Sequence, residues 1–240
     1  MKFPEPLSAG RLRRRYKRFL ADVVLDDGRE ITAHCPNTGA MLGCDTPGAR
    51  VWLSRTDRPG RKYPWTWELV EADGGVTVGI HTGRTNALVA EAIHAGTIPA
   101  LSGYPVVRRE VSAGATRVDF VLEAPRRRDC VLEVKNVTAG VGRGIALFPD
   151  AVSQRATRHV EFLAGQAGLG RRAVLLFCVQ RADVREVRPA DEIDPAYGRA
   201  LRAARAAGVE VMAWGCDVSP RQVAVRRRLR VRMPALRRPV

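Results

Sequence analysis

The sequence has few features that would place the protein in or across a membrane. No run of about eighteen apolar residues occurs along its 240 residues, and the segment from Met1 to Pro6 lacks the apolar stretch of a signal peptide. There is also no amphipathic anchor with exposed Trp and Leu. We therefore expect a cytoplasmic protein without a membrane partner.

Cysteine is scarce and irregularly placed. The chain contains Cys35, Cys44, Cys130, Cys178 and Cys216. An odd number, wide spacing and the lack of a C-x-x-C pair argue against a disulfide framework and against a zinc ribbon. We expect reduced cysteines, most of them buried as small apolar residues.

Acidic residues are few compared with basic ones. The chain has 25 Asp and Glu against 40 Lys and Arg, which gives a formal net charge of +15 at pH 7. Clustered basic residues attract a polyanion, because binding releases the counterions that surround it. We therefore expect a nucleic-acid partner, and we favour DNA over RNA.

Much of the positive charge lies near the two ends of the chain. The first cluster, predicted to contact nucleic acid, includes Arg11, Arg13, Arg14, Arg15, Tyr16, Lys17 and Arg18. The second cluster comprises Arg221, Arg226, Arg227, Arg228, Arg230, Arg232, Arg237 and Arg238. For any single arginine, ordinary solvent exposure is the alternative. The alternating apolar residues of the second cluster also leave open a structural strand in place of a binding tail.

The N-terminal third reads as short strands and turns. Strands are expected at residues 19–25, 30–35, 50–53, 65–70 and 76–80, with turns such as Asp27-Gly28 between them. A five-stranded set without a helix suits a small barrel that hides its edges, and the OB-fold is the commonest such barrel that binds nucleic acid. We predict an OB-like β-barrel domain over residues 1–82.

The pattern changes after the turn-rich segment 81–86, which ends in a predicted helix N-cap at Asn86. Helices are expected at residues 87–93, 151–167 and 195–207, and strands at 106–111, 116–122, 130–135, 173–179 and 209–214. This alternation predicts a mixed sheet with flanking helices over residues 83–240. The fold class is therefore α/β (α+β).

Three polar residues in a predicted hairpin are the main candidates for chemistry. Asp119 alternates with Val118, Phe120 and Leu122 and should lie on the opposite face of its strand. Glu133 and Lys135 are two residues apart and should point to one side of the next strand. A loop over residues 124–129 would bring the two strands side by side.

Two carboxylates and the backbone carbonyl of Val134 form a set of oxygen ligands that suits Mg²⁺ or Mn²⁺. Lys135 would then hold the attacking water and offset charge on a phosphate, which is a phosphodiester-cleaving arrangement. In the alternative, Asp119 pairs with an arginine, and Glu133 with Lys135 forms an ordinary ion pair on a solvated strand face.

A second basic face is expected on the helix over residues 151–167. Arg155 and Arg158, with His159 beside them, have near-helical spacing and could meet phosphates. A solvated helix face is an equal alternative.

Longer strings resemble the sugar fermentation stimulation protein family, called SfsA. They occur in order at residues 15–23, 33–41, 91–93, 117–120, 133–138, 148–152 and 193–195. The resemblance implies an OB-like domain joined to a PD-(D/E)XK nuclease-like domain. It also implies DNA binding and a link to the regulation of sugar, especially maltose, utilisation.

By the same resemblance, Asp119, Glu133 and Lys135 form the core of the site, and Glu91 on the preceding helix is an additional acid. Two hypotheses stay open. The protein is a DNA-binding protein with little sequence specificity that retains a nuclease-like metal site, or it is an active magnesium-dependent nuclease.

Overall fold

The computed structural model describes residues 1–57, 59–113 and 116–235. Arg237 and Arg238 of the second basic cluster, and Ala115, at which the predicted hairpin segment 115–135 begins, therefore lie outside the described residues. Within the described part, no helix has the length and apolar character that a bilayer-spanning helix needs. All five cysteines are free and buried, as expected from their spacing.

The N-terminal region is a closed five-stranded barrel, which confirms the OB-like fold. Strand β1 pairs with β2 and β4, β2 pairs with β3, β4 pairs with β5, and the parallel β3–β5 pairing closes the ring. A sixth strand, β6, adds to β5. The bounds are β1 Ser8–Tyr16, β2 Leu20–Leu25, β3 Glu30–His34, β4 Arg50–Arg55, β5 Trp65–Ala72 and β6 Val76–Gly79.

The strand β1 was not predicted from the sequence. It carries the first basic cluster as far as Tyr16, and only Gly10 and Leu12 of its nine residues are buried, so its apolar alternation is weak. The expected fifth strand is β6, which lies beside the closed ring. The barrel therefore has the expected number of strands, but β1 takes the place assigned to residues 76–80.

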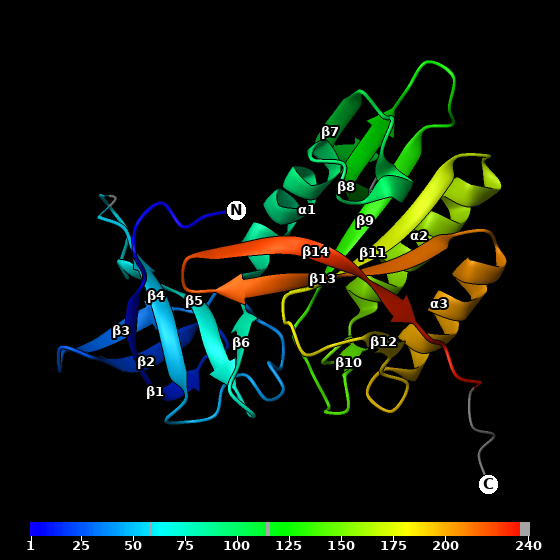
Figure 1. Ribbon diagram of the computed structural model, residues 1–240. Helices are drawn as coiled ribbons and strands as arrows, with labels where there is room; N and C mark the ends of the chain where they lie inside the picture. Colours follow the sequence, from blue (N-terminus) through cyan, green and yellow to red (C-terminus); the bar gives the residue numbers. More distant parts are fainter. Residues whose placement is uncertain (58, 114–115, 236–240) are drawn as a thin grey trace, which may run out of the picture.

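The rest of the chain forms an eight-stranded mixed sheet with helices on both faces, as predicted (Figure 1). The strand order is β10-β12-β14-β13-β11-β9-β8-β7. The strands are β7 Val106–Ala113, β8 Thr116–Glu123, β9 Cys130–Val137, β10 Ile145–Phe148, β11 Arg172–Val179, β12 Glu186–Pro189, β13 Glu210–Ser219 and β14 Gln222–Val231. The helices are η1 Thr82–Arg84, α1 Thr85–His94, η2 Pro99–Leu101, α2 Gln154–Gly168 and α3 Pro195–Ala206.

Each face of this sheet has its own apolar core. Leu88 and Ile93 of α1 pack with Leu132 and other side chains on one face. Leu163 of α2 and Leu201 of α3 pack with side chains on the other. Strand β11 contributes to both cores because its residues are buried on either side, which matches its continuous apolar sequence.

The second basic cluster includes a structural strand. Its residues Val223, Val225 and Leu229 are buried, and β14 pairs with β13 and β12. The hairpin of β13 and β14 contacts the N-terminal segment, where the Phe3 backbone N–H donates to the Arg221 carbonyl at 3.2 Å. The short strands β10 and β12 were not expected, because each has only four residues.

Candidate functional site

The predicted hairpin of β8 and β9 forms, and the two strands separate at Asp119. The regular pairing runs from Leu122↔Cys130 to Phe120↔Leu132. At the next position, the Val134 backbone N–H donates to Asp119 Oδ2 at 2.7 Å. The side chain of Asp119 thus replaces a backbone acceptor and is fixed against β9.

The expected alternation along β8 holds for two of its three apolar residues. Phe120 and Leu122 pack in the core beneath α1, but Val118 packs with Val121 in the core beneath α2. The prediction that all three share one face is therefore wrong. The change occurs where β8 leaves its regular pairing with β9, so strict alternation along the strand no longer applies.

The second oxygen of Asp119 is oriented by Asn86. The Asn86 amide donates to Asp119 Oδ1 at 2.8 Å and also to Glu110 Oε1 at 2.9 Å. Asn86 is not the helix N-cap that we predicted, because the 3-10 helix η1 continues directly into α1 and the N-cap is Arg84. Burial and the negative charge of Glu133 raise the pKa of Asp119.

The Glu133 side chain is buried among basic groups. Its residue is 4% exposed, and Lys135 Nζ donates to Glu133 Oε1 at 2.7 Å. His159 Nδ1 contacts the same oxygen and lies 3.2 Å from Lys135 Nζ. Burial alone would raise the pKa of Glu133, but the His159 hydrogen bond and the Lys135 charge lower it. Glu133 is therefore held in its ionised form.

Helix α2 places His159 at the site. Ser153 caps this helix by accepting the Ala156 backbone N–H at 3.1 Å, and the Ser153 backbone N–H donates to Asp194 at 2.8 Å. Arg155 and His159 then lie one turn apart, with Arg155 Nε 3.4 Å from His159 Nε2.

These groups open into a cleft of about 500 Å³ between the barrel and the mixed sheet. The sheet side contributes the acidic and basic groups described above. The barrel side contributes Arg18 and the loop residues Asn37, Thr38 and Gly39. The cleft is therefore a joint product of both regions of the chain.

The barrel loop is fixed on both of its sides. Arg15 Nη2 donates to the carbonyls of Asn37 and Gly39 at 3.0 and 2.7 Å. From the sheet side, Asp150 Oδ2 accepts the Met41 backbone N–H at 2.9 Å. A Cβ atom on Gly39 would lie 2.7 Å from Asp150 Oδ2, so the close approach requires glycine.

The residues of the first basic cluster have different surroundings. Arg18 lines the cleft and donates to the Thr38 carbonyl at 2.9 Å. Arg15 is largely buried and holds the loop. Arg13 pairs with Glu30 at 2.9 Å, and Arg14 pairs with Asp22 at 2.8 Å. These two line a separate hollow with their acidic partners.

The remaining residues of this cluster lie outside the cleft lining. Tyr16 donates its hydroxyl to Asp22 at 3.1 Å, and Lys17 is exposed at the turn after β1 with φ 49°. On α2, Arg155 lines the cleft, whereas Arg158 is exposed and does not.

The structure does not bring Glu91 to the cleft. Its carboxylate pairs with the N-terminal amine of Met1 at 2.9 Å, and its side chain is 56% exposed. The neighbouring Ala92 and Ile93 are buried, so Glu91 lies on the outer side of α1. Asn86, at the start of the same helix, contacts Asp119 in its place.

Sequence reasoning also missed Glu110, which lines the cleft on the strand next to β8. Within residues 1–57, 59–113 and 116–235, no group of three or more His, Cys, Asp and Glu side chains is arranged to hold a metal ion. The candidate metal ligands are thus the two carboxylates of Asp119 and Glu133, a number typical of Mg²⁺ sites that keep several waters.

Comparison with known proteins identifies the family. Residues 14–80 match the model described as the SfsA N-terminal OB domain, and residues 83–222 match the sugar fermentation stimulation protein RE domain. The chain belongs to the sugar fermentation stimulation protein (SfsA) family. The resemblance seen in the sequence is therefore confirmed.

SfsA relatives match along nearly the whole chain. A sugar fermentation stimulation protein homolog of Alkalilimnicola ehrlichii is 59% identical over 238 residues, which cover 98% of this chain and 100% of that protein. A homolog of Pseudomonas aeruginosa is 51% identical over 236 residues, covering 97% and 100%. The solved structure of Pyrococcus furiosus SfsA in complex with Ca²⁺ has a TM-score of 0.86 at 27% identity, covering 97% of this chain and 98% of that one.

Proposed function

We propose that this protein binds DNA with little sequence specificity and hydrolyses phosphodiester bonds in the cleft, with Mg²⁺ or Mn²⁺. One observation carries the proposal: the carboxylates of Asp119 and Glu133 line the same cleft, together with Lys135. Two ionised carboxylates in a largely buried position repel each other unless a cation lies between them.

The donors fit a hard divalent cation. Asp119 and Glu133 offer only oxygen atoms, which suit Mg²⁺ and Mn²⁺ better than thiolate-preferring metals. The solved SfsA relative is described as a complex with Ca²⁺, another cation with oxygen ligands. When bound, the metal would polarise the phosphate and favour deprotonation of the attacking water.

The surrounding residues have distinct roles in this proposal. Asn86 and the Val134 N–H orient Asp119, because each donates to one of its carboxylate oxygens. Lys135 lies beside Glu133, where it would hold the attacking water and offset charge on the phosphate. Arg18 and Arg155 line the cleft from the barrel and α2, and would hold the nucleic-acid backbone from both sides.

The alternative ion-pair interpretation agrees less well with these contacts. Among the described residues, Asp119 makes no ion pair with an arginine, and Glu133 is buried, not on a solvated strand face. The ion pair between Glu133 and Lys135 does form. It lies at the cleft, where the same lysine can meet a phosphate.

The test is metal-dependent cleavage of single- and double-stranded DNA and RNA by the purified protein and by Lys135→Ala. Removing this one positive group should lower the rate at least about a hundredfold. Lys62→Ala is the matched control, because Lys62 is an exposed lysine of the barrel that does not line the cleft. Binding without cleavage for every substrate and metal would reject the hydrolysis.

A second candidate is DNA binding without cleavage. It is favoured by the position of Glu133 Oε1, which already contacts both Lys135 and His159 and so has its charge offset by the protein itself. The resemblance also implies regulation of sugar, especially maltose, utilisation. We include that role in the proposal, and growth on maltose of a strain lacking the gene tests it.

A further inference from the structure

A groove distinct from the cleft lies along β14. It has a volume of about 1130 Å³ and shares no lining residue with the cleft. Its floor is apolar and comes from Ile145, Val211, Met212, Leu229 and Val231. The strand β10 runs from the groove to the cleft, since Ile145 at its start lines the groove and Phe148 at its end lines the cleft.

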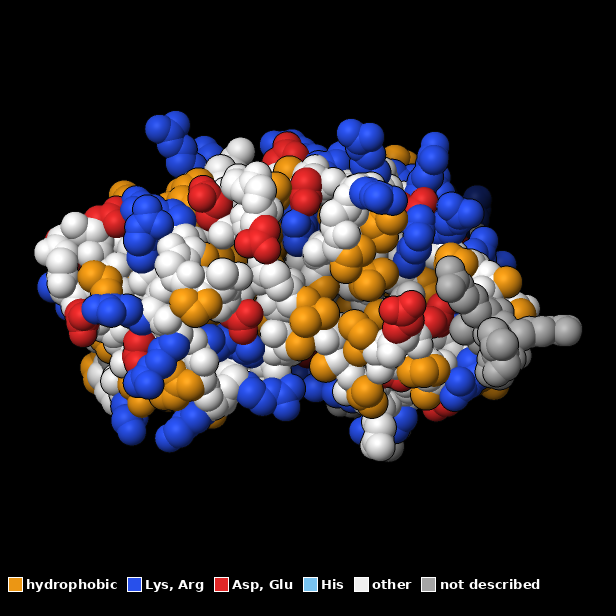
Figure 2. Space-filling model, turned by 90° about the horizontal axis from the view of Figure 1, so that it is seen from below, with side chains coloured by type: hydrophobic (Ala, Val, Ile, Leu, Met, Phe, Trp, Pro, Cys, Tyr) orange, Lys and Arg blue, Asp and Glu red, His pale blue; other side chains and the backbone are white. Residues whose placement is uncertain are grey.

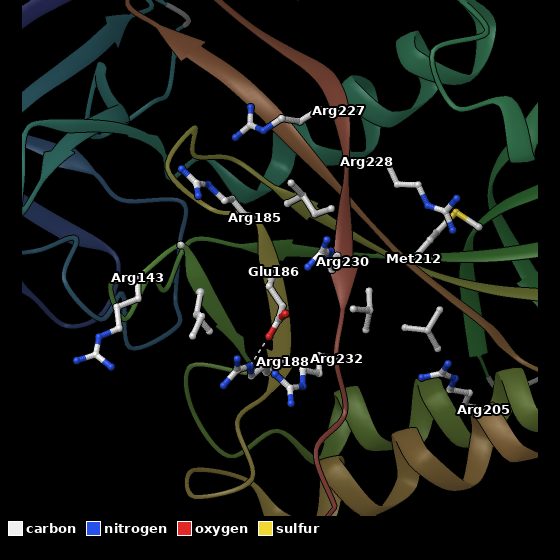
Figure 3. A pocket seen from close by; sticks show the side chains of 15 residues that line it. Arg143, Arg185, Glu186, Arg188, Arg205, Met212, Arg227, Arg228, Arg230 and Arg232 are labelled. Carbon is white, nitrogen blue, oxygen red and sulfur yellow. Dashed lines mark hydrogen bonds and ion pairs between the residues drawn. The ribbon is translucent and has the colours of Figure 1, made fainter.

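Arginine dominates the rim of this groove (Figure 3). The arginines come from β12, β14, α3 and three segments outside these elements, and they are Arg143, Arg185, Arg188, Arg205, Arg227, Arg228, Arg230 and Arg232. Among the described residues of the lining, Glu186 is the one acid, and it pairs with Arg188 at 2.5 Å. Figure 2 shows basic side chains gathered near an area of hydrophobic ones on the underside of the molecule.

Most of this charge is not offset by the protein. Arg227 pairs with Asp217 at 3.4 Å. No ion pair with a described acid occurs for six of the lining residues, Arg143, Arg185, Arg205, Arg228, Arg230 and Arg232. Like charges gathered in a hollow repel one another and attract an anion.

The strand β14 and the residue that follows it space part of this charge regularly. Arg228, Arg230 and Arg232 are exposed at alternate positions, whereas Leu229 between them is buried. Residues two apart on a strand are roughly 7 Å apart. A row of cations with this repeat suits a chain of phosphates, not one isolated anion.

The size and composition of the groove narrow the class of ligand. Its volume exceeds the upper end of about 1,000 Å³ for small-molecule pockets, and one phosphate needs far fewer arginines. No Phe, Tyr or Trp occurs among the lining residues that the structure describes, so the groove lacks the stacking platform that single strands use. It also contains none of the exposed large hydrophobic residues that would enter a membrane.

We propose that this groove is a second contact site for the phosphate backbone of double-stranded nucleic acid, acting independently of the metal cleft. The inference rests on the proposed binding of nucleic acid but not on cleavage. The arginines would anchor the duplex by charge, while Asp119, Glu133 and Lys135 act on it at the cleft.

The test compares two variants with the same loss of three charges. The groove variant is Arg228→Gln/Arg230→Gln/Arg232→Gln. The control is Arg126→Gln/Arg128→Gln/Arg199→Gln, whose arginines are exposed and line neither the groove nor the cleft. Binding of a labelled DNA duplex is measured by fluorescence anisotropy over a range of salt concentrations, with EDTA so that cleavage plays no part.

The groove variant should bind about tenfold more weakly, and its plot of log K against log salt should be shallower by about two to three, since each phosphate contact contributes about 0.9. The control should keep the slope of the unaltered protein. If the groove variant does not fold, as judged by circular dichroism, Arg143→Gln/Arg185→Gln replaces it with an expected reduction of about two.

Equal slopes for the groove and control variants would overturn the inference, even if the unaltered protein binds and cuts DNA. Loss of binding to anionic phosphatidylserine vesicles with unchanged DNA binding would overturn it as well, and would assign the groove to membranes. Failure of the unaltered protein to bind any duplex would reject both the groove and the proposed function. Binding that depends on the groove without any cleavage would reject only the hydrolysis.

Discussion

Asn86 and Asp119 are 33 residues apart in the sequence and are joined by a hydrogen bond of 2.8 Å between the amide and Oδ1. This contact connects the start of α1 to β8 and turns the carboxylate toward the cleft. Because the same amide also donates to Glu110, Asn86 positions two of the acids that line the cleft.

Asn86→Ala should therefore weaken the metal site without unfolding the protein. Removing a residue that orients a metal ligand typically lowers affinity or activity about 10–100-fold. Mg²⁺ titration by calorimetry and the cleavage rate measure the effect. Glu91→Ala is the control on the same helix, and it should change neither quantity, because Glu91 pairs with the N-terminal amine outside the cleft. A larger effect of Glu91→Ala than of Asn86→Ala would contradict the assignment.

Asn86 and Asp119 also show what the sequence can predict. The grouping of Asp119, Glu133 and Lys135 could be predicted, because alternation within β9 places Glu133 and Lys135 on one side and a hairpin brings Asp119 beside them. The role of Asn86 could not be predicted, because it depends on η1 continuing into α1, which moves the N-cap to Arg84. Local preference made Asn86 a cap, while the tertiary contact with Asp119 decides its role.

The fold was predictable to a similar extent. The continuous apolar sequence of β11 indicated a buried strand, and the periodic helices were found where expected. The strands β1 and β14 were less visible because exposed arginines alternate with their buried residues. Their places depend on pairing with distant segments, such as β1 with β4 and β14 with β12, and local sequence does not encode those pairings.

Gly39→Ala should destabilise the contact between barrel and sheet. The new methyl group would overlap the Asp150 carboxylate that binds the Met41 N–H, and overpacking of this kind costs about 1–3 kcal/mol. Urea denaturation measures the free energy of unfolding. Gly165→Ala is the matched control: Gly165 lies within α2 with open space around it, so alanine should stabilise the protein by up to about 1 kcal/mol. Equal stability of the two variants would contradict the close approach at Gly39.

Asp119 and Glu133 should affect stability with opposite pH dependence when no metal is present. The pKa of Asp119 is raised by burial and by Glu133, so its favourable contribution is present at low pH and is lost as the pH rises through that raised pKa. The pKa of Glu133 is lowered by His159 and Lys135 despite its burial, so its contribution is present at neutral pH and is lost as the pH falls through that lowered pKa.

Unfolding by urea across acidic to neutral pH measures both contributions. With rising pH, Asp119→Asn should gain stability relative to the unaltered protein, and Glu133→Gln should lose it. Added Mg²⁺ should stabilise the unaltered protein more than either variant, since only the unaltered protein has both carboxylates. The same pH dependence for both variants would show that the two acids do not interact as the structure indicates.

His159→Ala should shift the pH dependence of cleavage. The His159 hydrogen bond is the largest of the effects that lower the pKa of Glu133, so its removal raises that pKa. The acidic limb of the rate profile should then move to higher pH, because Glu133 must be ionised to hold a metal. Arg158→Ala, on the adjacent exposed position of α2, should leave the profile in place. A lower rate with an unchanged acidic limb would mean that His159 acts on the substrate and not through Glu133.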